Sequence, residues 1–292
     1  MRARDREVLL ALYTSRALTT TQIDALLFNG PWPSVTTQKK PTRCQKRLQG
    51  LFHHGFVARS EQLQTLTDGR KPLVNMLSCE GWESAAQLLY ADAPYEWSDD
   101  KMLVSSPFLV HLLATNDVLV SITVAAKKRG WLVKKWLGEH ILRGPQLKEV
   151  VIIRGPKGGM DKAAVVPDGY FRLVTHADAY NFFVEMDRGT ETAEAGQWGR
   201  RDWERKILAY LAYYENGKYE QRYKTKDLRV LVVTTGERRL AHLKAVTEAA
   251  GGFGWFWFTT IRQVMEGDVL TGPMWQIAGE DGAFPLVPEG TR

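Results

Sequence analysis

Two strand-like segments that each carry a carboxylate, followed by a helical segment with a lysine, constrain this chain more than any other feature. They lie between residues 165 and 214 and read VVPDGYFRL, NFFVEMDRGT and WGRRDWERKILAYLAYY. The first contains Asp168, the second Glu185 and Asp187, and the third Lys206. Carboxylates on neighbouring strands bind hard cations, and a nearby lysine neutralises charge that develops on phosphate. We therefore expect these four residues to form a candidate catalytic site of the phosphodiesterase type, in which carboxylates hold a divalent cation.

The composition is that of a soluble globular protein large enough for two domains. The chain has 292 residues, of which 44% are hydrophobic and 25% charged, as is ordinary for such proteins. No uninterrupted apolar run approaches the roughly 20 residues of a membrane span, and the N-terminus lacks the apolar core of a signal peptide. Cys44 and Cys79 match no zinc-binding spacing, and Cys44 lies within a helical pattern as a packed residue. We expect a cytoplasmic protein with no membrane contact.

The positive charge is concentrated at the N-terminal end of the chain. Residues 1–60 contain ten Lys and Arg against three Asp and Glu, a net charge of +7, whereas the whole chain carries +6. A concentrated basic surface favours binding to the phosphate backbone of a nucleic acid. Double-stranded DNA is therefore the expected partner, and a charged face that is merely solvated is the alternative.

The N-terminal third predicts three helices followed by a β-hairpin. Helical patterns at 4–16, 19–28 and 41–55 each place apolar side chains on one face, and threonines cap the second helix. Two strand-like runs then flank Asp68-Gly69, which is a strong short-range signal for a hairpin. This order is that of a winged helix-turn-helix, in which the third helix enters the major groove and the hairpin, or wing, touches the backbone or minor groove.

Five cations in this region are the predicted DNA-binding residues. Arg43, Lys46 and Arg47 face outward on the third helix, and Arg70 and Lys71 lie on the wing. The competing interpretation is a winged helix that binds another protein, in which these residues only solvate the surface.

The rest of the chain predicts an α/β domain. We expect a winged-helix domain at 1–91, an acidic, proline-containing linker at 92–104 and an α/β domain at 105–292. Its helices and strands alternate in an order that suits a mixed central sheet, so the fold class is α+β overall. The run WFWF at Trp255–Phe258 could stack bases, but consecutive large apolar residues more often mark a strand buried on both faces.

The sequence resembles the replication-relaxation family of mobile genetic elements along nearly its whole length. The resemblance rests on the order and spacing of several motifs. They are L-x-x-L-x-x-x-G-F (Leu48, Leu51, Gly55 and Phe56), H-L-L-A-T-N-D at His111–Asp117, W-L-G-E at Trp136–Glu139, P-D-G at Pro167–Gly169, E-M-D-R-G-T at Glu185–Thr190 and K-I-L-A-Y at Lys206–Tyr210.

The resemblance implies a C-terminal domain similar to PD-(D/E)xK nucleases, that is, a restriction-endonuclease-like fold. In that fold an aspartate on one strand and a glutamate on the next bind Mg²⁺, and here these are Asp168 and Glu185. The usual lysine two residues after the glutamate is replaced by Asp187. Lys206, from the following helix, is the candidate substitute, and its alternative role is an ion pair with Glu185 or Asp187 that fixes the packing of strand and helix.

Three functions stay open on the sequence alone. The first is a DNA-binding accessory protein of a plasmid, phage or integrative element that acts in replication, mobilisation or regulation, with a nuclease-like core that is inactive. The second is a Mg²⁺- or Mn²⁺-dependent endonuclease targeted by its winged helix, and the third is a protein-interaction module. Other replication or mobilisation proteins and a second copy of the chain are further candidate partners. A tyrosine relaxase is rejected, because Tyr210, Tyr213 and Tyr214 have no histidine cluster to accompany them.

Overall fold

The computed structural model divides the chain into two units, Met1–Val124 and Ala125–Arg292. The structure describes residues 2–33, 42–62, 71–89, 106–154, 159–189 and 198–288, and in these parts it is a mixed α+β protein, as predicted. The division falls within the helix α5 (Ser106–Lys128), beyond the expected linker at 92–104, which lies outside the described residues.

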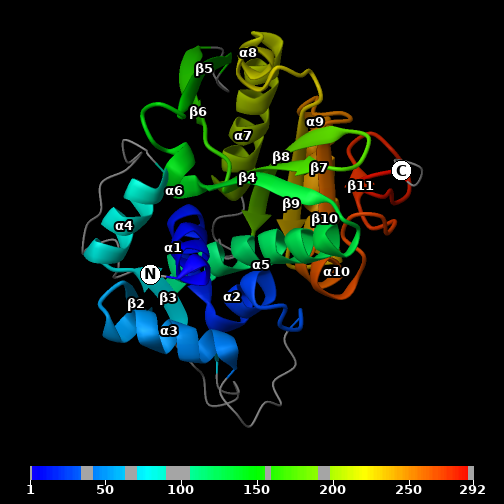
Figure 1. Cartoon of the computed structure of the whole chain (residues 1–292). Coiled ribbons are helices and arrows are strands. Elements are labelled where there is room, and N and C mark those ends of the chain that lie inside the picture. The colour runs from blue at the N-terminus through cyan, green and yellow to red at the C-terminus, as the bar shows by residue number, and fades with distance from the viewer. Residues whose placement is uncertain are drawn as a thin grey trace. The chain divides into compact units, whose positions relative to one another are not determined.

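The first unit contains short helices and a small antiparallel sheet (Figure 1). Its described helices before α5 are α1 (Ala3–Ser15), α2 (Thr20–Leu27), α3 (Arg43–His53) and α4 (Cys79–Leu89). Its described strands are β1 (Ala17–Thr19), β2 (Val57–Ser60) and β3 (Val74–Leu77), which pair in the order β1-β3-β2. Strands β2 and β3 are antiparallel, as a hairpin requires, and the predicted turn at Asp68-Gly69 lies outside the described residues.

Reciprocal caps begin two of these helices where the sequence places threonine. Thr19 accepts a hydrogen bond from the backbone N–H of Gln22, and the Gln22 side chain accepts one from the backbone N–H of Thr19. Thr42 and Gln45 do the same for α3. Each such capping box satisfies two backbone donors that would otherwise lack partners.

Helix α5 contributes buried polar groups to the first unit. Asn116 is 1% exposed and donates to the carbonyls of Ala17 (2.7 Å) and Ser15 (3.2 Å). Gln22 donates to Asp117 Oδ1 (2.7 Å), and burial raises the pKa of Asp117 to about 6 although this hydrogen bond lowers it. By length and hydropathy alone the stretch 107–128 could cross a membrane, yet half of it is buried within the protein. In that buried part Thr115, Asn116 and Ser121 are hydrogen-bonded, as in a core helix of a folded unit.

The second unit is built on a mixed sheet whose described part has six strands in the order β11-β10-β9-β8-β7-β4. The strands are β4 (Leu132–Gly138), β7 (Gly169–Val174), β8 (Ala179–Asp187), β9 (Arg229–Thr234), β10 (Phe256–Thr260) and β11 (Gln276–Ile277). Strands β8, β9 and β10 run parallel, and the other neighbouring pairs are antiparallel. The mixed central sheet expected from the sequence is thus confirmed.

Helices and a separate ribbon complete the second unit. The helices are α6 (Glu139–Leu142), α7 (Trp198–Glu215), α8 (Lys218–Tyr223), α9 (Glu237–Ala249) and α10 (Ile261–Glu266). The ribbon pairs β5 (Glu149–Arg154) with β6 (Met160–Val165) and lies against α7 (Figure 1). Side chains of α7, α9, β8, β9 and the ribbon share one apolar core. Phe256 and Phe258 of the WFWF run are fully buried in it, as the core interpretation predicts, whereas Trp255 and Trp257 are half-buried.

One expectation about an individual element needs correction. The segment VVPDGYFRL is not one strand, because β6 ends at Val165 and β7 begins at Gly169, so Asp168 lies in the connection just before β7.

Close packing between α4 and the backbone before β2 predicts an unusual response to substitution. Alanine normally stabilises a helix relative to glycine by about 1 kcal/mol. A Cβ added at Gly81, however, would lie 1.9 Å from the Phe56 carbonyl oxygen, whereas one added at Gly50 of α3 would have no atom within 4 Å. We expect Gly81→Ala to lower the free energy of unfolding by about 1–3 kcal/mol through overpacking and Gly50→Ala to raise it by about 0.5–1 kcal/mol. Urea unfolding of both variants tests this, and equal effects at the two positions would contradict it.

Candidate functional site

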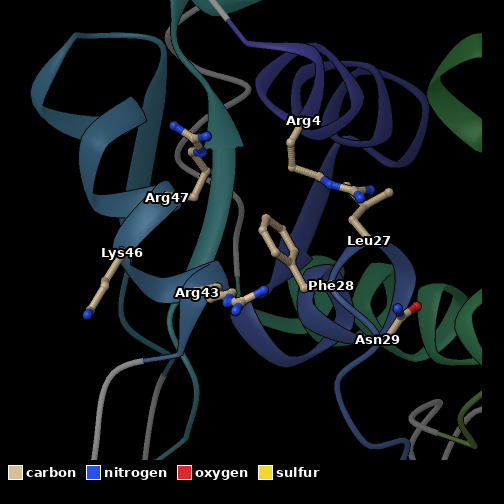
Figure 2. A pocket seen from close by; sticks show the side chains of 7 residues that line it. All are labelled: Arg4, Leu27, Phe28, Asn29, Arg43, Lys46 and Arg47. Atoms are coloured by element: carbon tan, nitrogen blue, oxygen red, sulfur yellow. The ribbon is translucent and has the colours of Figure 1, made fainter.

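A pocket lined by cations lies on the first unit, between the N-terminal ends of α1 and α3 and the C-terminal end of α2. Its volume is about 510 Å³. Figure 2 shows the residues that line it, which are Arg4, Leu27, Phe28, Asn29, Arg43, Lys46 and Arg47. Three of the five predicted DNA-binding residues are therefore brought together in one place. Arg70 lies outside the described residues, and Lys71 lies a few residues before β3.

The cations of this pocket lie at the end of α3 that already carries the positive charge of the helix dipole. Arg43, Lys46 and Arg47 occupy the first turns of α3, and that helix has no acidic residue in its first turn. The N-terminal end of a helix carries partial positive charge, which attracts anions and repels cations. Cations grouped at such an end are stabilised when an anion binds among them.

The cations differ in how firmly the protein holds them. Arg47 Nε lies 3.1 Å from Asp5 Oδ1, and the Asp5 side chain is only 9% exposed, so Arg47 ties α3 to α1. Arg4 pairs with Glu7 and also lies over the ring of Phe28, 5.6 Å from its centroid. For Arg43 and Lys46 no ion-pair partner occurs among the described residues. These two side chains are the pocket's most available donors to a phosphate.

A second candidate site forms where three carboxylates line up across the sheet of the second unit. Gly169 pairs with Val184 in β7 and β8, so one step further places Asp168 opposite Glu185. Gly138 pairs with Gly169 in β4 and β7, so the same step places Glu139 opposite Asp168. Two hydrogen bonds fit this register. Met186 N–H donates to Asp168 Oδ2 (2.8 Å), and Glu139 N–H donates to the Asp168 carbonyl (3.0 Å).

Glu185 is the centre of this cluster, and both of its oxygens are engaged. Lys206 Nζ lies 2.5 Å from Oε2 and the Tyr210 hydroxyl lies 2.6 Å from Oε1. The carboxylate is 2% exposed, and its burial raises the pKa of Glu185 to about 7 even though the Lys206 charge lowers it. Burial alone would lower the pKa of Lys206, but the charges of Glu185, Asp168 and Glu139 raise it above its usual range. Lys206 therefore stays protonated as the counter-charge of the cluster.

The cluster does not fit a ready-made metal centre. Within the described ranges no group of three or more His, Cys, Asp or Glu side chains is arranged to hold a metal ion. The lysine and tyrosine occupy the Glu185 oxygens that a cation would need. As folded, Asp168, Glu185 and Lys206 form a closed, hydrogen-bonded ion-pair cluster, which is the alternative role considered for Lys206.

Asp187 is held by other residues. Arg239 of α9 donates to both of its oxygens at 2.8 Å, and the Thr234 hydroxyl donates to Oδ2 at 2.8 Å. Burial opposes ionisation, but these hydrogen bonds outweigh it and hold the pKa of Asp187 below its usual value. Asp187 thus links α9 to β8 and β9. It stands at the position where the nuclease pattern has lysine, and its oxygens are bound by Arg239 and Thr234.

The sequence pointed to some members of these sites and not to others. It indicated Asp168, Glu185 and Lys206 as one group, and the structure places them together. Glu139 and the hydrogen bond of Tyr210 to Glu185 were missed, although W-L-G-E and K-I-L-A-Y were both noted as motifs. Tyr210 and Tyr213 are fully buried, in line with the rejection of a tyrosine nucleophile.

The basic helical unit and the mixed-sheet unit define a two-part α+β protein with one cationic site and one carboxylate–lysine site. The family model of replication-relaxation proteins matches residues 9–228, and the chain belongs to that family. Membership associates it with replication or mobilisation of mobile genetic elements. Comparisons with curated proteins and with solved structures found no match.

Removal of Lys206 should destabilise the protein, because it leaves the buried carboxylate of Glu185 without its counter-charge. We expect Lys206→Met to lower the free energy of unfolding by about 2 kcal/mol near neutral pH, less than the about 3–5 kcal/mol of fully buried pairs, because solvent screens a lysine whose side chain is 45% exposed. Without the ammonium group, burial raises the pKa of Glu185 further, so the folded protein keeps a proton that the unfolded chain releases. Stability therefore falls as pH rises above 4.5, the ordinary pKa, and in the variant the fall continues to higher pH than in the wild type, where it ends near the folded-state pKa of about 7.

Urea unfolding across this pH range measures the effect. The variant Glu185→Gln/Lys206→Met lacks the titrating group and keeps an acceptor for Tyr210, so its stability should depend less on pH. The explanation fails if the double variant loses stability over the same extended pH range as Lys206→Met.

Proposed function

We propose that this protein is a DNA-binding accessory factor of a plasmid, phage or integrative element and acts in replication, mobilisation or regulation. The observation that carries the proposal is the convergence of Arg4, Arg43, Lys46 and Arg47 on one pocket at the N-terminal end of α3. A phosphate backbone supplies the anions that such a pocket favours.

The arrangement of the first unit supports a winged helix-turn-helix as the DNA-binding domain. Helices α1, α2 and α3 precede the antiparallel strands β2 and β3, which is the order of that motif. In this proposal α3 enters the major groove, and the β2–β3 hairpin with Arg70 and Lys71 is the wing. The Arg47–Asp5 ion pair fixes the angle between α3 and α1, so that Arg43 and Lys46 reach the DNA.

The carboxylate–lysine cluster has a structural role in this proposal. Its charges are neutralised internally by Lys206, as expected for a nuclease-like core that has become a scaffold for DNA or for another replication or mobilisation protein. The protein acts in the cytoplasm, without a metal, and a homodimer would match a site with two-fold symmetry.

Substitutions on α3 test the DNA site. We expect Arg43→Gln/Lys46→Gln to weaken binding to duplex DNA about tenfold and to reduce the slope of log affinity against log salt by about 2, since each lost phosphate contact removes about 0.9. Fluorescence anisotropy of a labelled duplex at several salt concentrations measures both quantities. Lys226→Gln/Arg262→Gln removes two exposed cations of the second unit and should bind as the wild type does. Arg47 is left intact because its loss would also leave Asp5 buried without its partner. If Arg43→Gln/Lys46→Gln binds DNA as tightly as the wild type does, α3 is not the recognition helix.

A metal-dependent endonuclease is the second candidate, and the juxtaposition of Asp168, Glu185 and Lys206 favours it. If it is correct, purified protein should nick or cut supercoiled DNA with Mg²⁺ or Mn²⁺ and not with EDTA. Asp168→Ala/Glu185→Ala should abolish cleavage, whereas Asp187→Asn should retain it, because Asp187 is engaged by Arg239. Agarose gels with all three proteins decide between the candidates. If the wild type and the double variant both retard the DNA and neither cuts it, the nuclease candidate is rejected and the DNA-binding function remains.

A further inference from the structure

The β5–β6 ribbon, which is separate from the six-stranded sheet, has an outward face with exposed apolar side chains. Val151, Ile153, Ala163 and Val165 point inward and are buried against α7 in the main core. The alternate residues form the opposite face, here called the outer ribbon face. It consists of three cross-strand pairs, Val150–Ala164, Ile152–Lys162 and Arg154–Met160. All six side chains are exposed, and none is a carboxylate.

Its apolar members are unusually exposed for residues of their kind. Ile152 is 47% exposed, Met160 is 73% exposed and Val150 is 42% exposed. Adjacent exposed apolar side chains on a regular surface mark an interaction site rather than a random surface. Arg154 and Lys162 lie among them and have no ion-pair partner in the described part of the chain.

Cationic side chains also bind backbone carbonyls at both edges of the ribbon. Arg205 Nη2 donates to the Lys162 carbonyl (2.6 Å) at the edge of β6, and Lys218 Nζ donates to the Val150 carbonyl (2.7 Å) at the edge of β5. These bonds occupy backbone acceptors that an added strand would need, so a partner that extends the sheet is disfavoured. The two nearby acids are already paired, Glu149 with Arg222 (3.0 Å) and Asp161 with Arg205 (3.7 Å).

We infer that the outer ribbon face binds double-stranded DNA in the major groove, as a second DNA contact in addition to α3. A two-stranded ribbon fits the width of that groove. Phosphates border the groove on both sides, and Arg154, Lys162 and Lys218 have no ion-pair partner among the described residues. The charge complementarity of these cations with phosphate favours DNA over a protein partner. Val150 and Ile152 are suited to contact thymine methyl groups, which only the major groove presents. The inference rests on the proposed DNA-binding function and adds the contribution of the second unit.

The test uses the full chain and a labelled duplex selected by the wild-type protein from a random-sequence library. We expect Arg154→Gln/Lys162→Gln to weaken binding about tenfold and to reduce the salt slope by about 2. Lys226→Gln/Arg262→Gln is the charge-matched control and should leave both unchanged. Val150→Thr/Ile152→Thr keeps β-branched side chains that suit a strand, so it should fold, retain the salt slope and bind about threefold to tenfold more weakly.

Replacing thymine by uracil in the duplex separates groove contact from a general charge effect. Loss of the methyl groups should weaken binding by the wild type severalfold and binding by Val150→Thr/Ile152→Thr by a smaller factor, because each threonine keeps only one methyl group for this contact. Hydroxyl-radical footprinting should show a protected segment for the wild type that is missing for Arg154→Gln/Lys162→Gln.

The possible failures are distinguishable. If the ribbon variants bind DNA as the wild type does while Arg43→Gln/Lys46→Gln binds weakly, the ribbon inference is refuted and the proposed function stands. If the wild type does not bind duplex DNA, both are refuted. If Val150→Thr/Ile152→Thr converts a dimer to a monomer in sedimentation velocity without a change in DNA affinity, the face is an interface with a second copy of the chain, and the inference is again overturned.

Discussion

The buried charge of Glu185 is the constraint on which the second unit depends. A carboxylate on a central strand of a sheet is costly to bury unless it is paired and hydrogen-bonded. Lys206 and Tyr210, one turn apart on α7, satisfy its two oxygens, and this fixes the position and the rotation of α7 on the sheet. Asp187, two residues further along β8, does the same for α9 through Arg239. The two polar anchors orient the two helices whose apolar faces fill the core.

A comparable arrangement of buried polar groups holds the first unit together. Asn116 of α5 satisfies carbonyls at the junction of α1 and β1, and Gln22 of α2 reaches Asp117 on α5. Apolar packing tolerates many arrangements of helices, whereas a buried amide or carboxylate requires its partner at a defined position. This explains why α5, apolar enough in composition for a membrane, belongs to the core of a folded unit.

Local signals in the sequence predicted much of this structure. The cap at Thr19, the mixed sheet and the grouping of Asp168, Glu185 and Lys206 follow from helix and strand patterns within short windows. Glu139 was not predicted as a neighbour of Asp168, because that depends on the register of β4 with β7 across a separation in sequence that no local pattern encodes. The ribbon was missed as well, since its strand β6 and the start of β7 read as one continuous segment around Pro167. Likewise, the position of the division within α5 was not predicted, because the hydrogen bonds of Asn116 and Asp117 join this helix to residues far away in the sequence.

The two charged sites differ in how many of their charged groups already have partners within the protein. This difference decides which of the two proposed functions we rank first. In the second unit each carboxylate oxygen of Glu185 and Asp187 has a donor from the same chain, so a cation must displace an existing bond before it can bind. At the N-terminal end of α3, Arg43 and Lys46 are set against the helix dipole, and their charges are neutralised by no described acid. An anion at α3 would therefore meet charges without a described partner, whereas a cation at Glu185 would compete with Lys206 and Tyr210. For this reason we rank DNA binding ahead of metal-dependent cleavage, although the residues of both sites are in place.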